Sequence, residues 1–249
     1  NVIIPEGLKI ADVPASKVRD GVVIEDKDGN QFVWVPVATI ADYKRTWCKG
    51  YDPFSSYSEA LPEDEKTSVK TYKGFYIGRY EAGDKENIEA KTVTIKANQA
   101  PYNYVRRTQA VSLAEGFATK QGYKAKTKLV SSYAWDTTIA FLQKVNSDYG
   151  SSSEEGNYRD TTFSYTDITG ASQIKAESST VLVPTGQTTP VCNIYDMGGN
   201  VWEWTTESYS NTGGPCTIRG GLYSNDFAID PAGRRGVRSD IDADFIGFR

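Results

Sequence analysis

The segment from Cys192 to Trp204, CNIYDMGGNVWEW, constrains the fold more than any other part of the chain. It places a Gly-Gly pair between an apolar approach and a Trp-Glu-Trp run, and glycine is the residue that a tightly curved backbone tolerates best. We expect a turn at the glycines, followed by core positions for Trp202 and Trp204. Further on come RGG at 219–221 and a closing GFR at 247–249, whose arginine we expect to pair inside the protein.

Local patterns in the first third predict short strands. Apolar runs at 22–25 and 32–37 flank a charged stretch that contains Asp-Gly-Asn, a pattern typical of a β-hairpin. A further strand is predicted over 75–83, after a polar, tyrosine-rich loop over 51–72.

Two segments have helical patterns. Ser112 followed by Glu115 forms a capping-box pattern, which predicts a helix over 112–123. Helical spacing of Trp135, Ile139 and Leu142 predicts a second helix over 131–145 with one buried face. Sixteen tyrosines and 22 glycines are typical of an irregular, loop-rich fold with aromatic packing.

The length of 249 residues fits one large domain or two small ones. Residues 1–20 carry two prolines and no sustained periodicity, so we interpret them as an extended lead-in or linker and place the folded domain at 21–249. No apolar run approaches the roughly 18 residues of a membrane span, and we expect no membrane insertion.

Composition excludes several kinds of chemistry. The chain has no histidine, which removes the Ser-His-Asp triad, the Cys-His dyad and His-ligated metal sites. A net charge of −4 argues against nucleic-acid binding, which depends on neutralising phosphates. The three cysteines show no CxxC spacing.

The order VWVPV (33–37), YIGRYEAG (76–83), YDMGGNVWEW, RGG and GFR resembles the formylglycine-generating enzyme (sulfatase-modifying factor) family over most of residues 30–249. The fold of that family is a variant of the C-type lectin fold. The resemblance implies an α+β, C-type lectin-like fold with extensive irregular loops, short antiparallel strands and two helices.

The catalytic residues of the resembled oxidases are missing from this sequence. In that family two redox-active cysteines that bind copper lie between the RGG and GFR motifs, whereas residues 222–246 contain no cysteine and Asn225 stands where the first is expected. A thiolate is the ligand and nucleophile that this chemistry needs. We therefore expect no oxidase activity and no copper.

The cysteines that remain suggest a structural role. Cys192 and Cys216 are candidates for a disulfide across the 192–216 segment, which would contribute about 3 to 3.5 kcal/mol by the chain-entropy model. The alternative is two buried free thiols. Cys48, beside Trp47, is interpreted as a small buried apolar side chain.

The resemblance also points to a structural calcium site at the DMGGNVWE turn. Its ligands would be the side chains of Asp196 and Glu203 with the backbone carbonyls of Gly199 and Val201, a set that suits a hard cation. The alternative is that the two carboxylates cap backbone amides of the turn.

Residues 222–246 use a restricted set of amino acids. Lys, Glu, Gln, Met and Trp occur only before Tyr209, and all acids in the segment are Asp and all bases are Arg. The absent types are those whose codons cannot end in a pyrimidine. This resembles the variable proteins of diversity-generating retroelements, which use the same lectin-type fold and in which adenine-directed mutagenesis randomises surface residues near the C-terminus. The alternative is an Asp-rich loop on a fixed scaffold.

The candidate ligand-binding residues are accordingly surface positions of this segment: Tyr223, Ser224, Asn225, Asp226, Phe227, Asp240, Asp242 and Asp244. Tyr223 and Phe227 would be aromatic anchors, and the polar side chains would supply adaptable hydrogen bonds. The sequence thus predicts a non-enzymatic domain that binds a protein or glycan on a target cell, displayed on a phage tail or bacterial surface or otherwise extracellular. An oxidase relative and a structural tail or wall protein that packs into a homo-oligomer are the alternatives.

Overall fold

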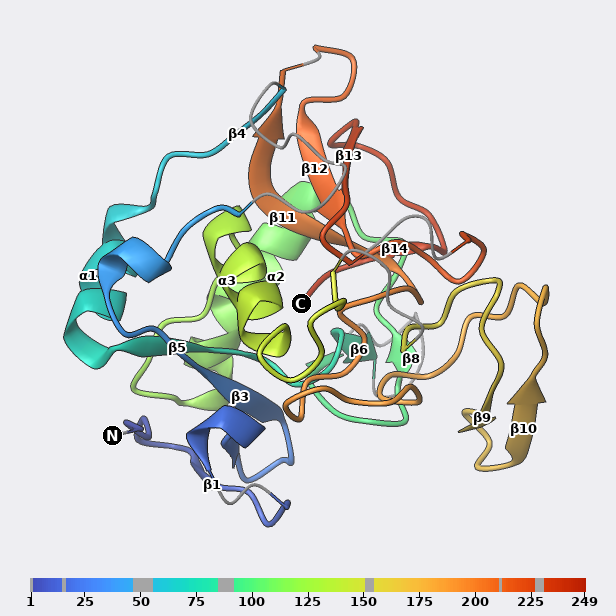
Figure 1. Cartoon of the computed structure of the whole chain (residues 1–249), viewed down its shortest axis with the longest axis horizontal. Helices are drawn as coiled ribbons and strands as arrows, with labels where there is room; N and C mark the ends of the chain where they lie inside the picture. Colours follow the sequence, from blue (N-terminus) through green and yellow to red (C-terminus); the bar gives the residue numbers. More distant parts are fainter. Residues whose placement is uncertain are drawn as a thin grey trace.

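The computed structural model of the chain describes residues 2–14, 17–46, 56–84, 92–150, 155–210, 212–226 and 231–249. Within these ranges the fold is mixed α+β, with irregular loops joining short strands, as expected (Figure 1). Its α-helices are α1 (Glu63–Tyr72), α2 (Arg107–Gln121) and α3 (Ser132–Leu142).

One antiparallel sheet is built by the N-terminal third, in the order β1-β2-β3-β5. Its strands are β1 (Lys9–Ile10), β2 (Val23–Glu25), β3 (Gln31–Pro36) and β5 (Gly74–Gly78). The predicted hairpin is confirmed, since β2 pairs antiparallel with β3. The Asp26 carboxylate closes its turn by accepting hydrogen bonds from the N–H groups of Asp28 (2.9 Å) and Asn30 (2.8 Å). The first strand of this sheet lies within residues 1–20, so part of the expected lead-in pairs with the domain; the boundary at residue 21 stays a prediction.

The C-terminal third builds most of a second sheet, in the order β13-β12-β11-β14, and β4 from the N-terminal third pairs with the far end of β11. Its strands are β4 (Tyr57–Ser58), β11 (Trp202–Tyr209), β12 (Cys216–Arg219), β13 (Arg234–Val237) and β14 (Ile246–Gly247). The Trp-Glu-Trp run begins β11, and both tryptophans are buried as predicted. The turn before it is tight: Gly199 has φ +71°, and a Cβ there would lie 2.3 Å from the Asn157 carbonyl oxygen.

Helices α2 and α3 lie between these two sheets (Figure 1). Helix α3 packs against both β3 and β11, and its Trp135 is fully buried. The Trp135 indole donates a hydrogen bond to the Pro231 carbonyl (2.9 Å), which ties the helix to the C-terminal segment.

The helix boundaries differ in part from the expectation. Helix α3 begins after Ser131, whose hydroxyl accepts from the Ala134 N–H, close to the predicted start. The predicted start of the other helix was wrong, because Ser112 lies inside α2 and donates to the Thr108 carbonyl (3.1 Å). Helix α1 was not expected; it occupies part of the predicted 51–72 loop.

Two smaller sheets complete the described chain. Strands β6 (Gly83–Asp84), β7 (Val93–Thr94) and β8 (Ala100–Pro101) form one, and β9 (Phe163–Thr166) pairs with β10 (Ser172–Lys175) in a hairpin at the edge of the molecule (Figure 1). None of the helices seen in the described ranges is long and apolar enough to cross a membrane.

The predicted disulfide is absent. Cys192 and Cys216 are both free, buried thiols, and they lie in two different apolar clusters of the core. Burial raises the pKa of the Cys192 thiol to about 11 and also raises that of Cys216. Spacing alone could not show that the two thiols face different clusters. The position of Cys48 lies outside the described residues.

Candidate functional site

A buried network of ion pairs holds the C-terminal segment against the core. Asp136 of α3 accepts from Arg219 of β12 (2.6 Å) and from Arg234 of β13 (2.5 Å). Arg234 also donates to Glu207 of β11 (2.9 Å), and Arg45 reaches the same carboxylate (2.6 Å). All but Arg45 have side chains exposed by 1% or less. The RGG arginine is thus a structural residue that joins a helix to two strands.

Residues 222–246 include buried, half-buried and exposed positions. Leu222, residues 231–234 and Ile246 are buried, so their side chains are committed to the core. Ser224, Asp226 and residues 238–240 are exposed. The restricted set of amino acids therefore covers core and surface alike. Among its described members Arg235 is exposed on β13, and the other exposed members lie in two loops, 223–226 after β12 and 238–245 between β13 and β14.

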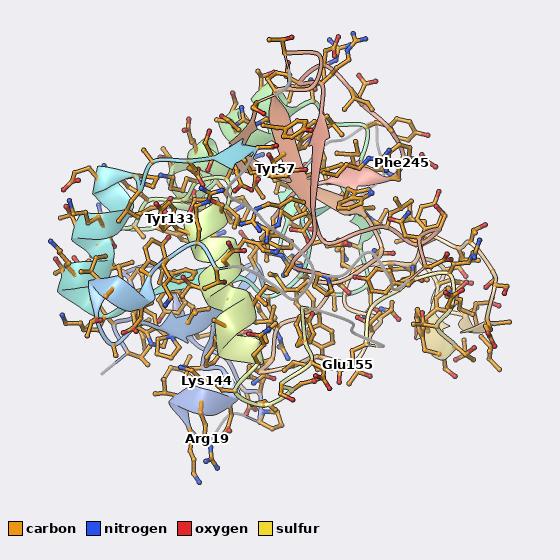
Figure 2. The ribbon with its side chains drawn as sticks, turned by 45° about the horizontal axis from the view of Figure 1, so that its top comes forward. Arg19, Tyr57, Tyr133, Lys144, Glu155 and Phe245 are labelled. Carbon is orange, nitrogen blue, oxygen red and sulfur yellow. The ribbon has the colours of Figure 1, made fainter. Side chains whose placement is uncertain are left out.

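The two loops meet at Tyr223 and Asp244. The Tyr223 hydroxyl donates to the Asp244 carboxylate (3.1 Å), and burial followed by this contact raises the pKa of Tyr223. Phe245, the neighbour of Asp244, marks this part of the surface at the end of the molecule opposite Arg19 and Lys144 (Figure 2). We call the set of Tyr223, Ser224, Asp226, Asp240, Asp242 and Asp244 the C-terminal face.

Each exposed aspartate of the C-terminal face pairs with an arginine. Asp226 contacts Arg159 (2.5 Å) and Asp242 contacts Arg106 (3.0 Å), both from outside the segment, while Asp240 contacts Arg238 (2.6 Å). Their carboxylates remain 45% to 55% exposed, so a ligand can reach them. Pairs this exposed contribute little to folding.

The other two candidates differ. The Asn225 side-chain oxygen accepts from the Leu222 N–H (3.2 Å), so it closes the loop on itself and is half-buried. Phe227 lies outside the described residues.

Sequence reasoning missed the framework residues that border the C-terminal face. Tyr104 donates its N–H to the Ala243 carbonyl (3.0 Å), and the Asn103 side chain donates to the Asp244 carbonyl (2.7 Å). Nothing in their local sequence marks them, because their position depends on how β8 and α2 pack on the C-terminal loops.

The predicted calcium ligands are buried and engaged by protein donors. Asp196 accepts from the Gly186 N–H (2.7 Å) and from Thr188 (3.2 Å), and Glu203 forms an ion pair with Arg249 (3.0 Å). The internal pairing expected for Arg249 is confirmed. Among the described residues, no group of three or more His, Cys, Asp or Glu side chains is arranged to hold a metal ion. Calcium therefore stays a prediction, in which the ion would compete with the Arg249 guanidinium for Glu203.

A third carboxylate, Glu81, belongs to this buried cluster. It accepts from the Asn200 side chain (2.7 Å) and from the Val201 N–H (3.2 Å). Burial, together with the charges of Asp196 and Glu203, raises the pKa of Glu81 well above its usual range. The cluster anchors the turn that leads into β11.

The comparisons with known proteins agree with this architecture. The sulfatase-modifying factor enzyme 1-like domain family matches residues 114–249, more than half of the chain, and the chain belongs to this family. No curated protein matches it.

Three solved structures match most of the chain at low sequence identity. PvdO from Pseudomonas aeruginosa has 17% identity and a TM-score of 0.47, covering 91% of this chain and 95% of that one. CarF has 15% identity and a TM-score of 0.45, covering 88% and 85%. Treponema denticola variable protein 1 has 11% identity and a TM-score of 0.41, covering 100% and 91%.

Proposed function

We propose that this chain is a non-enzymatic recognition domain that binds a protein or glycan on a target cell through its C-terminal face. The observation that carries the proposal is that two partly exposed loops, both composed of the restricted set of amino acids, meet through the Tyr223–Asp244 hydrogen bond, while a buried ion-pair network holds the neighbouring strands. A rigid scaffold beneath exposed loops is the arrangement that allows a binding surface to change without unfolding the domain.

The chemistry of the thiols supports a binding role over an oxidase role. The thiols of Cys192 and Cys216 are buried in separate clusters, and burial raises both pKa values, which disfavours the reactive thiolate. Residues 222–246, where the family's oxidases carry their cysteine pair, have none.

The restricted set of amino acids supports a diversified surface of the kind found in the variable proteins of diversity-generating retroelements. Such a domain acts outside the cell, on a virion tail or a bacterial surface, without nucleic acid and without membrane insertion. Packing against sister subunits into a homo-oligomer is compatible with this role.

A cell-binding experiment tests the proposal. Fluorescently labelled protein is measured by flow cytometry on a panel of bacterial cells, and on a glycan array. The test variant replaces four exposed residues of the C-terminal face, Ser224, Asp226, Asp240 and Asp242, with alanine. The control replaces four exposed residues of α1, Glu63, Thr67, Ser68 and Lys70, with alanine. We expect binding to be lost in the test variant and kept in the control; equal binding by both contradicts the proposal.

A further inference from the structure

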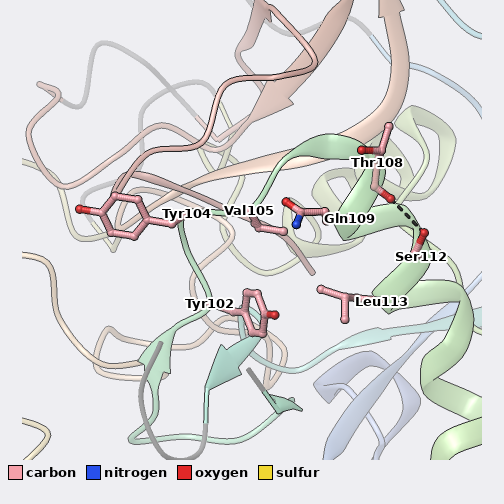
Figure 3. A pocket seen from close by; sticks show the side chains of 7 residues that line it. All are labelled: Tyr102, Tyr104, Val105, Thr108, Gln109, Ser112 and Leu113. Atoms are coloured by element: carbon pink, nitrogen blue, oxygen red, sulfur yellow. Dashed lines mark hydrogen bonds between the residues drawn. The ribbon is translucent and has the colours of Figure 1, made fainter. Parts of the chain in front are cut away.

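A pocket of about 380 Å³ lies beside the C-terminal face, between the segment that follows β8 and the first turns of α2 (Figure 3). Seven residues line it: Tyr102, Tyr104, Val105, Thr108, Gln109, Ser112 and Leu113. All of them lie outside residues 222–246. The volume is at the lower end of the range of about 300 to 1,000 Å³ that small-molecule pockets span, so it suits one large side chain better than an extended ligand.

Backbone and side-chain contacts fasten the wall of this pocket to the C-terminal face. The Tyr104 N–H donates to Ala243, and Arg106 forms its ion pair with Asp242. The Arg107 N–H also donates to the Ser239 carbonyl (3.4 Å). The pocket therefore adjoins the C-terminal face. The face consists of residues from the restricted set of amino acids, whereas the pocket is lined by residues outside 222–246.

Tyr104 is held in an unfavourable backbone conformation at this junction. Its φ is +49°, in the left-handed region, where the backbone of an L-residue with a large side chain has a higher free energy. Nevertheless, 47% of the residue is exposed to solvent. Packing in the core does not explain a strained, exposed aromatic residue. Its side chain points away from α2 (Figure 3), so it stands at the border between the pocket and the C-terminal face.

The lining of the pocket favours an apolar occupant. None of the seven residues is charged. Five carry a polar side-chain group, and of these Ser112 donates to the Thr108 carbonyl and the Gln109 side-chain oxygen accepts from the Arg106 N–H. A sugar carries a hydroxyl on almost every carbon, and each hydroxyl that loses water without gaining one of the few polar partners left in this lining opposes binding. An aliphatic or aromatic side chain fills the same space without that cost.

We infer that this pocket is a fixed anchor site, which takes one apolar side chain of a protein partner while the C-terminal face contacts the polar surroundings of that side chain. The inference rests on the proposed function and narrows its target to a protein. Recognition surfaces commonly combine one buried anchor with a polar rim, so an unchanging anchor is compatible with a face that varies.

Small probes test the pocket directly. N-acetyl-L-leucinamide, N-acetyl-L-phenylalaninamide and methyl β-D-glucopyranoside are titrated separately into ¹⁵N-labelled protein, and amide chemical shifts are followed. We expect saturable shifts at Tyr104, Val105 and residues 108–113 with the two amino-acid amides and none with the glycoside. Absence of shifts with the amides, or shifts with the glycoside alone, overturns the inference.

A pair of variants on α2 provides the control. Ser112→Tyr places a ring at the mouth of the pocket, and Thr119→Tyr places the same ring two turns further along the helix, at an exposed position outside the lining. The amide-induced shifts should vanish in Ser112→Tyr and persist in Thr119→Tyr. Shifts that survive in Ser112→Tyr place the probe elsewhere and overturn the inference.

The cell-binding experiment separates this inference from the proposed function. Binding lost both in Ser112→Tyr and in the variant with four alanines on the C-terminal face supports both. Binding lost only in the four-alanine variant overturns the anchor and leaves the recognition face standing. Binding lost only in Ser112→Tyr leaves the pocket standing and contradicts the role of the face.

Discussion

Asp136→Asn should strongly destabilise the protein, although aspartate and asparagine side chains have nearly the same shape. The Asp136 carboxylate lies 2.6 Å from Arg219 and 2.5 Å from Arg234, with all three side chains exposed by 1% or less. The substitution keeps the shape and removes the charge, so the buried guanidinium groups of Arg219 and Arg234 are left with Glu207, a carboxylate that Arg45 also pairs with. Removing one partner of a buried pair costs about 3 to 5 kcal/mol, a large part of the roughly 5 to 15 kcal/mol that a domain usually has.

The matched control is Asp226→Asn. Asp226 lies 2.5 Å from Arg159, the same distance as in the buried pair with Arg234, but its side chain is 50% exposed. Exposed pairs contribute about 0 to 1 kcal/mol because water already solvates both charges. The two variants therefore differ in burial and not in contact distance.

Urea denaturation followed by tryptophan fluorescence and far-ultraviolet circular dichroism measures both variants. We expect the midpoint for Asp136→Asn to fall with the slope unchanged, and the melting temperature to drop by about 6 to 20 °C. Asp226→Asn should lie close to the wild type. Equal losses in the two variants would refute the reasoning that burial decides the value of these pairs.

Three further predictions concern the core. Tyr123→Phe removes the hydroxyl that donates to Asp26 (2.5 Å) and should cost about 1.5 to 3 kcal/mol in urea denaturation at pH 7. Burial opposes the ionised Asp26 carboxylate, but hydrogen bonds from Asn30 and Tyr123 outweigh burial and lower the pKa of Asp26. The stabilisation by this hydrogen bond is therefore present above pH 3.8 and is lost as the pH falls further. A cost of Tyr123→Phe that stays constant down to pH 2 would argue against this reasoning. Reductant should leave the melting temperature unchanged, because Cys192 and Cys216 are free; a drop would indicate a bridge. Calcium added to chelator-treated protein should raise the melting temperature, and no shift with no bound metal would remove the predicted site before β11.

Elements with a strong local signal were predictable. The β2–β3 hairpin follows from two apolar runs around an Asp-Gly-Asn turn, and α3 follows from the helical spacing of Trp135, Ile139 and Leu142. Both depend on short-range patterns that tertiary packing only reinforces.

The missed elements have physical reasons. Helix α1 buries only Val69, so it lacks the apolar periodicity by which helices are found, although three acids in its first turn and the preceding Pro62 are start signals. Ser112 with Glu115 has the pattern of a capping box but lies mid-helix, while the helix actually begins after Arg106, whose N–H bonds to Gln109. A local motif cannot show whether a helix has already begun.

The candidate site was likewise predictable only in part. The restricted set of amino acids in residues 222–246 identified surface positions, yet it did not distinguish Ser224 from the buried Arg234, because burial depends on Asp136 and Glu207 far away in the sequence. Tyr104 and its pocket could not be predicted for the same reason, because they are far from residues 222–246 in the sequence and adjoin the C-terminal face only in the folded structure.

Sequencing the 3′ end of this gene across a closely related population tests the central claim most directly. The account predicts substitutions concentrated at adenine-containing codons for exposed positions, such as Ser224, Asp226, Asp240 and Asp242, with the buried codons for Leu222, residues 231–234 and Ile246 and the DMGGNVWEW and GFR codons unchanged. Residues 222–246 as invariant as their flanks would contradict it and favour a fixed ligand or a structural role.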